Sequence, residues 1–172
     1  MSSHKRLSLI SNHLRSQQIS TKSATKNLYR NRQDYKYFLP IQTRWSDADC
    51  YNHINNAIYY HYFDTVINEY LIKHCGLQPG NISNKPIGLV VASQANFYAS
   101  ASYPSIIDAG LSIAKIGNSS VTYRVGIFEK DSPLACVVGG FTHVFVDSVH
   151  RKPVQSLPEE FLEGFKKIID TE

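Results

Sequence analysis

Side chains that can do chemistry crowd into one short stretch, RWSDADCYNHINN, which runs from Arg44 to Asn56. Aspartate side chains are ionised at neutral pH, and a carboxylate can attack a carbonyl carbon or activate water. Asp47 and Asp49 supply two such groups. His53 adds an imidazole, which exchanges protons readily near neutral pH. These residue types, two to four positions apart, make this stretch the candidate site for a nucleophile or a general base.

A helix is predicted directly after this stretch. Apolar side chains recur at helical spacing, at Tyr59, Tyr62, Phe63, Val66, Ile67, Tyr70 and Leu71. Gly76 can end such a helix, so the spacing predicts one long amphipathic helix from about Asn55 to Cys75. Asn55 is a favoured N-cap residue, and the first N–H groups of a helix have no partner inside it. We therefore expect the backbone N–H of Asn56 to be able to stabilise an oxyanion.

The remaining elements are strands and one short helix. Alternating or continuous apolar runs predict strands at 37–45, 87–98, 106–116, 121–128 and 134–146. Pro40 favours an edge position for the first strand or a position at its start, and the almost entirely apolar last strand is expected to be central. A short closing helix follows Pro158. This order predicts an α+β fold, in which an antiparallel sheet of about five strands wraps around one long central helix.

The basic charge of the chain belongs to its N-terminal tail. Residues 1–34 carry a net charge of +6, whereas residues 35–172 carry −2. The first 33 residues contain no acid and nine Ser or Thr, which is typical of a mitochondrial transit peptide; the alternative is a disordered tail of a cytoplasmic protein. We assign 1–34 to this tail and 35–172 to the folded domain. The slightly acidic domain argues against nucleic-acid binding.

The sequence gives little support for a metal site, a disulfide framework, a reactive cysteine or a membrane span. Cys50, Cys75 and Cys136 are too few and too scattered for a zinc site or a disulfide framework. The acids beside Cys50 disfavour a reactive thiolate there. We expect no metal and no cofactor. No apolar run approaches the roughly 20 residues that cross a bilayer, so a membrane span is not expected.

The pattern D-x-D-x-x-x-H-[VI]-N-N-x-x-Y-x-x-Y-F carries a resemblance to a known family. It is present as Asp47, Asp49, His53, Ile54, Asn55, Asn56, Tyr59, Tyr62 and Phe63. The chain resembles the hot-dog-fold thioesterases of the 4-hydroxybenzoyl-CoA thioesterase type. The segments GNSSVTYRVGIF, THVFVD and RKPVQSLPEEF are similar to later parts of that family, so the resemblance spans about Tyr35 to Asp170.

This resemblance implies roles for particular residues. It assigns the catalytic carboxylate to Asp49. Asp64 is the rival, because a second branch of hot-dog thioesterases carries its acid on the helix. His53 either holds the loop or acts in catalysis, and we favour the structural role. The family usually has Gly before this His, whereas Asn52 stands there, and Asn tolerates the left-handed backbone that such a turn needs.

Three further residues, Tyr59, Ser119 and Ser120, have two interpretations each. Tyr59 belongs to the core or lines the acyl pocket. Ser119 and Ser120 resemble a position that lines the pantetheine channel, or are ordinary turn residues. His143, which alternates with Phe141 and Phe145, is interpreted as a structural strand histidine.

The function implied by the resemblance is hydrolysis of an acyl-CoA thioester to a free acid and CoA, by a homodimer or homotetramer. Two alternatives stay open. The acyl group could be attached to an acyl-carrier protein instead of CoA, or the domain could have lost catalysis and serve as a binding or assembly module.

Overall fold

The computed structural model describes residues 28–80 and 85–170. Residues 1–27 of the predicted tail therefore lie outside the described residues. Two 3₁₀ helices, η1 (Arg32–Asp34) and η2 (Trp45–Asp47), flank strand β1 (Tyr37–Gln42). The other elements are α2 (Asn56–His74), β2 (Ile87–Phe97), β3 (Ile106–Ile116), β4 (Ser120–Glu129), β5 (Val137–Val146) and α3 (Glu159–Lys166).

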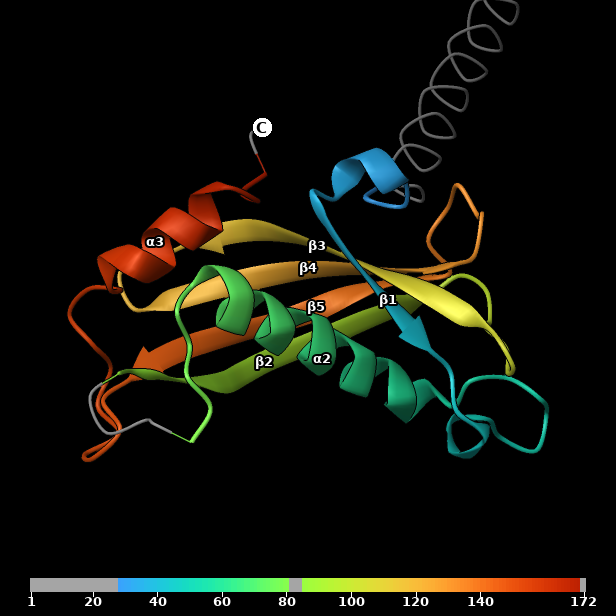
Figure 1. Cartoon of the computed structure of the whole chain (residues 1–172), viewed down its shortest axis with the longest axis horizontal. Coiled ribbons are helices and arrows are strands. Elements are labelled where there is room, and N and C mark those ends of the chain that lie inside the picture. Colours follow the sequence, from blue (N-terminus) through green and yellow to red (C-terminus); the bar gives the residue numbers. More distant parts are fainter. Residues whose placement is uncertain (1–27, 81–84, 171–172) are drawn as a thin grey trace, which may run out of the picture.

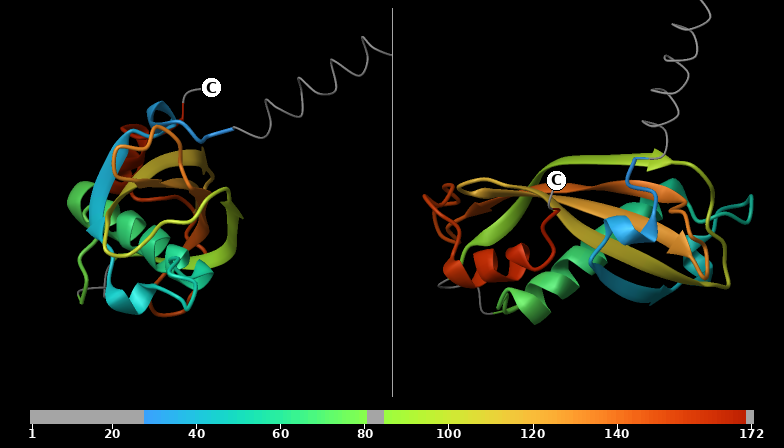
Figure 2. Two further views of the ribbon diagram at one scale, coloured as in Figure 1. Left: turned by 90° about the vertical axis from the view of Figure 1, so that its right-hand side faces the viewer. Right: turned by 90° about the horizontal axis from the view of Figure 1, so that it is seen from above.

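The five strands form one antiparallel sheet in the order β1-β3-β4-β5-β2. Helix α2 lies across the concave face of this sheet, and α3 covers one end of the same face (Figures 1 and 2). The predicted fold class is thereby confirmed. β1 and β2 are the two edge strands, as Pro40 suggested for β1, and β5 lies inside the sheet between β4 and β2.

Helix α2 forms where the periodicity predicted it. The seven apolar residues of the predicted stripe are all buried, and they pack on β1, β3, β4 and β5. Asn55 is the N-cap, and its side chain accepts a hydrogen bond from the Ala57 N–H. Gly76 follows the helix at φ +66°, a conformation that strains residues with a Cβ atom. The chain then turns toward β2.

The first strand is shorter than predicted. It ends at Gln42 instead of Trp45, because the Asp47 carboxylate accepts the Arg44 N–H and bends residues 45–47 into the 3₁₀ helix η2. Side-chain hydrogen bonds to nearby backbone compete in this way with regular structure. The bend turns the chain toward the helix N-terminus.

Residues just ahead of β1 pack on the outer face of the sheet. Tyr35 contacts Phe38 and Phe128 edge to face, and its hydroxyl donates to the Tyr29 carbonyl. Arg32 forms an ion pair with Asp108 at 2.7 Å. Residues 28–34, the part of the predicted tail that the structure describes, therefore lie against the sheet. Among the residues that the structure describes, no helix has the length and apolar character needed to cross a membrane.

Candidate active site

The loop between β1 and α2 is fixed by a buried acid. The Asp47 side chain is 0 % exposed, and its oxygens accept hydrogen bonds from the Arg44 backbone at 2.8 Å, from Arg44 Nε at 3.0 Å and from the Tyr62 hydroxyl at 2.8 Å. Arg44 Nη2 also forms an ion pair with Asp47, at 2.9 Å. Asp47 thus has structural partners on both oxygens, and it ties the loop to the side of α2.

Charge and hydrogen bonding decide the ionisation of this buried acid. Burial raises the pKa of the Asp47 carboxyl, but the hydrogen bonds from Arg44 and Tyr62 outweigh burial and leave the pKa below its ordinary value. Asp47 therefore stays ionised at neutral pH. The Asp47 carbonyl also accepts the Asn55 N–H at 2.9 Å, so this residue sets where the helix begins.

Asp49 lies at the open side of the same loop. One of its oxygens, Oδ1, accepts the backbone N–H groups of Tyr51 at 2.8 Å and His53 at 3.2 Å. Oδ2 has no hydrogen-bond partner within residues 28–80 and 85–170, and the residue is half-buried. Two backbone donors therefore orient the carboxylate and leave its second oxygen available for chemistry.

The N-terminus of α2 offers an unused donor beside this loop. The Asn55 side chain accepts the Ala57 N–H at 3.0 Å, and the Asn55 carbonyl accepts the Ile58 N–H at 2.9 Å. The N–H of Asn56 donates to no atom of the described chain. As the first residue of the helix, Asn56 points this N–H out of the positive end of the helix dipole. Such a donor can hold a developing oxyanion.

His53 contributes to the loop through its backbone. Its carbonyl accepts the Asp49 N–H at 2.8 Å, so the residues between Asp49 and His53 form a closed turn. Asn52 in this turn has φ +61°, which confirms the left-handed conformation expected where the family has Gly. The His53 imidazole is exposed, and it has no hydrogen-bond partner in the described part of the chain.

Tyr59 lies in the core beneath the helix start. It is buried, it contacts Tyr62 and Phe97 edge to face, and its hydroxyl accepts the Ala101 N–H at 2.9 Å. Burial raises the pKa of Tyr59 to about 12, so the hydroxyl stays protonated. Because Ala101 also accepts the Ile54 N–H, Tyr59 helps to hold the segment before the helix.

Asp64 and the serines lie away from the helix N-terminus. Asp64 is exposed on α2, eight residues or about 12 Å beyond Asn56, and it accepts a hydrogen bond from Asn68. Ser119 and Ser120 lie at the β3–β4 turn, at the end of the sheet where α2 finishes (Figure 1). Within one chain the structure brings Asp49, His53, Asn55 and Asn56 together and leaves Asp64, Ser119 and Ser120 apart from them.

Three aromatic residues at the site were not foreseen. The Tyr62 hydroxyl reaches Asp47, although the helical spacing marked Tyr62 only as a core residue. Trp45 and Tyr51 are exposed aromatic side chains in the loop itself. Their only signal in the sequence was their position inside the acidic motif. Among residues 28–80 and 85–170, no three His, Cys, Asp or Glu side chains gather to hold a metal ion.

Known proteins resemble this chain in sequence and in fold. Residues 51–136 match the model of the thioesterase superfamily. The PA5185 protein from Pseudomonas aeruginosa is 39% identical, with a TM-score of 0.79, over 83% of this chain and 97% of that chain. A search of curated proteins found no match.

Two more distant solved structures share the fold. A 1,4-dihydroxy-2-naphthoyl-CoA thioesterase from Synechocystis is 16% identical, with a TM-score of 0.68, over 76% of this chain and 95% of that one. A predicted thioesterase from Bacillus stearothermophilus is 18% identical, with a TM-score of 0.67, over 79% and 98%. The family match, the identity to the Pseudomonas protein and the fold together show that this chain belongs to the thioesterase superfamily, as a hot-dog-fold thioester hydrolase.

Proposed function

We propose that the protein hydrolyses acyl-CoA thioesters, with Asp49 as the catalytic carboxylate and the Asn56 N–H as the oxyanion donor. The observation that carries this proposal is the pairing of two unused groups at one place. The free Oδ2 of Asp49 and the free N–H of Asn56 flank the same exposed loop at the start of α2. The similar solved structure from Synechocystis is named as a 1,4-dihydroxy-2-naphthoyl-CoA thioesterase, which supports CoA as the carrier.

The proposed reaction uses each group once. Asp49 either takes a proton from water as the water attacks the thioester carbonyl, or attacks that carbon itself to form an anhydride that water then hydrolyses. In both routes the carbonyl oxygen becomes an anion and binds the Asn56 N–H. The carbon–sulfur bond breaks, CoA leaves as its thiolate, and a proton returns to the sulfur. The products are a carboxylic acid and CoA.

The other predicted residues receive supporting roles in this proposal. Asn55 caps the helix and fixes the direction of the Asn56 N–H, and the backbone of His53 orients Asp49. Asp64 lies about 12 Å along the helix from Asn56, which is too far for it to act on a carbonyl bound there. Asp64 is therefore not assigned the catalytic role.

We also propose that two copies of the chain pair through β2. This edge strand is 11 residues long, and it exposes apolar side chains, including Val91 at 61 % and half-exposed Val90 and Phe97. A long, apolar edge strand is a template for pairing with another strand. Two β2 strands related by a twofold axis would run antiparallel. The Ile87 end of the partner would then lie beside the Phe97 end of this chain.

Such a dimer would complete the site. Ser119 and Ser120 lie near the Ile87 end of the sheet, since Ser120 pairs with Val144 and Val144 pairs with Leu89. Antiparallel pairing would bring the partner's turn toward the Asn56 of this chain. In this dimer, the turn with Ser119 and Ser120 would line the pantetheine channel of the other subunit's site.

A lysine on the edge strand tests the dimer. We expect the parent protein to sediment at about twice the 19.5 kDa of one chain. Val91→Lys should shift it toward the monomer and lower hydrolysis, because a charge blocks edge pairing. Val149→Lys is the matched control, since Val149 is 75 % exposed and follows β5. A dimeric Val91→Lys protein would contradict pairing through β2.

A substrate panel tests the function. We expect release of free thiol from acyl-CoA substrates, and slower release when the same acyl group is attached to an acyl-carrier protein. Faster turnover of the carrier-protein thioester would support that carrier instead. Absence of hydrolysis across short, long and aromatic acyl-CoAs, together with stable co-purifying proteins, would favour a binding module.

A further inference from the structure

A short antiparallel ladder links the loop of Asp49 to the start of α2. The Asp49 N–H donates to the His53 carbonyl at 2.8 Å, and the Asn55 N–H donates to the Asp47 carbonyl at 2.9 Å. The residue pair between these two hydrogen bonds forms an antiparallel β-bridge. The position of the proposed carboxylate relative to the helix N-terminus therefore depends on how this ladder is held.

One strand of the ladder is attached to α2 through Tyr62. The Tyr62 hydroxyl, in the second turn of the helix, donates to Oδ2 of the fully buried Asp47 at 2.8 Å. The carbonyl of the same Asp47 accepts the N–H of the N-cap residue Asn55. A movement of Asp47 would therefore be passed directly to the residue before Asn56.

The other strand of the ladder is attached to α2 through Tyr59. The Ile54 N–H donates to the Ala101 carbonyl at 2.9 Å, and the Ala101 N–H donates to the Tyr59 hydroxyl at 2.9 Å. Tyr59 is 1 % exposed and Ala101 is 0 % exposed, so bulk water does not compete for this hydrogen bond. Tyr59 thus holds the ladder from the side opposite to Tyr62.

We infer that the hydroxyl groups of Tyr59 and Tyr62 position the Asn56 N–H relative to the Asp49 carboxylate for the reaction. The inference rests on the proposed function, because that proposal makes these two groups the reacting ones. Each hydroxyl acts through a buried residue that bonds the ladder or belongs to it. Tyr59 and Tyr62 are therefore positioning residues, and Tyr59 serves the reaction from the core instead of lining the acyl pocket.

Small displacements at the helix N-terminus have large effects on the rate. An oxyanion donor acts where its nitrogen lies about 2.7–3.1 Å from the oxygen, and misplacement of reacting groups by about 1 Å can cost about 100-fold. Loss of one hydroxyl leaves the rest of the ladder bonded and the apolar stripe of α2 buried. We therefore expect each hydroxyl to contribute less than this, about tenfold in kcat.

Removal of single hydroxyl groups tests the inference. Tyr59→Phe and Tyr62→Phe each keep the buried ring, and each should lower kcat for acyl-CoA hydrolysis about tenfold. KM should stay near the parent value, because neither hydroxyl contacts the substrate in the proposed site. A parent kcat in either folded variant would overturn the role of that hydroxyl. A raised KM with a parent kcat in Tyr59→Phe would assign Tyr59 to the acyl pocket instead.

Tyr70→Phe is the matched control on the same helix. Tyr70 is 2 % exposed, and its hydroxyl donates to the Gly164 carbonyl at 2.6 Å near the other end of α2. Each of the three Tyr→Phe variants loses one buried hydrogen bond, so their melting temperatures should fall to a similar extent. Tyr70→Phe should nevertheless keep the parent kcat. A tenfold loss in Tyr70→Phe would mean that reduced stability, and not position, lowers the rate.

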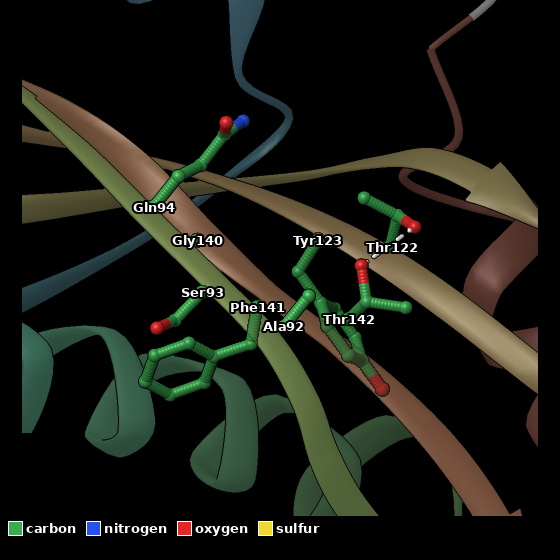
Figure 3. Close-up of a pocket in the computed structure, with 8 residues that line it drawn as sticks. All are labelled: Ala92, Ser93, Gln94, Thr122, Tyr123, Gly140, Phe141 and Thr142. Atoms are coloured by element: carbon green, nitrogen blue, oxygen red, sulfur yellow. Dashed lines mark hydrogen bonds between the residues drawn. The ribbon is translucent and has the colours of Figure 1, made fainter.

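A hydroxyl on the other face of the sheet gives a second control. Thr142 of β5 shares a hydrogen bond of 3.1 Å with Thr122 of β4, and both side chains point away from α2, whereas Phe141 points toward it (Figure 3). Thr142→Val removes this bond and leaves the ladder intact. Its kcat should equal that of the parent. A tenfold loss here would also count against the inference.

A double-mutant cycle identifies the group through which the hydroxyls act. Asn56→Pro removes the proposed oxyanion donor, so loss of a positioning hydroxyl should cost no further activity in that background. Tyr62→Phe combined with Asn56→Pro should therefore have the kcat of Asn56→Pro alone. The same cycle with Tyr59→Phe should give the same result, so either tyrosine completes the test if the other variant does not fold.

The outcomes separate this inference from the proposed function. A parent kcat in folded Asn56→Pro would reject the proposed oxyanion donor, whatever the tyrosine variants show. A large loss in Asn56→Pro with a further tenfold loss in the double variant would keep that donor and overturn the positioning role. No further loss in the double variant, with parent rates in Tyr70→Phe and Thr142→Val, would establish it.

Discussion

Replacement of Asp49 by Asn is expected to lower kcat for acyl-CoA hydrolysis by about 10³-fold, within the range of a positioned acid or base. Asn keeps an oxygen that can accept the Tyr51 and His53 N–H groups, so the loop should keep its shape. The loss would then come from the missing charge at Oδ2. Steady-state rates of free-thiol release measure it.

Two other acids make this experiment specific. Asp131→Asn is the matched control, because Asp131 is exposed in the turn after β4 and its left-handed backbone, φ +62°, suits Asn. It should hydrolyse acyl-CoA at the parent rate. Asp64→Asn tests the rival acid. Parent rates in Asp49→Asn together with a large loss in Asp64→Asn would transfer the catalytic role to the helix.

Replacement of Asn56 by Pro should lower kcat by about 10²- to 10³-fold, the usual effect of losing one oxyanion donor. Proline removes the backbone N–H at the first helical position, where proline is well tolerated. Asn55 has φ −58° and ψ 139°, a conformation that residues before proline favour. The helix should therefore form as before, and circular dichroism can confirm this.

The control for this variant is Asn56→Ala, which keeps the N–H and removes only the side chain. It should lose far less activity than Asn56→Pro. Equal losses in the two variants would mean that the Asn56 side chain, and not its backbone N–H, serves the reaction. An unchanged rate in folded Asn56→Pro would exclude this N–H as the oxyanion donor.

The sequence was most informative where structure is local. The stripe from Tyr59 to Leu71 predicted α2 because burial of a helix follows a period of 3.6 residues. Asn55 and Gly76 marked its ends because caps need particular side chains and backbone angles. The left-handed turn at Asn52 was predictable for the same reason.

The sequence was least informative where side-chain hydrogen bonds redirect the chain or where distant segments meet. The end of β1 depended on how Asp47 bonds the Arg44 backbone, and a strand pattern does not show such a bond. The Tyr62 hydroxyl reaches Asp47 only because the loop folds back on α2. The mitochondrial location of the protein stays a prediction, since it depends on the tail.

A crystal structure with a non-hydrolysable ketone analogue of acyl-CoA tests most directly whether Asp49 and Asn56 act on one carbonyl group. We predict that the analogue's carbonyl oxygen lies about 2.7–3.1 Å from the Asn56 nitrogen. The carbonyl carbon should lie about 3.5 Å from an Asp49 oxygen, or one water molecule away from it. A carbonyl bound beside Asp64, or one turned away from the N-terminus of α2, would contradict the proposed mechanism.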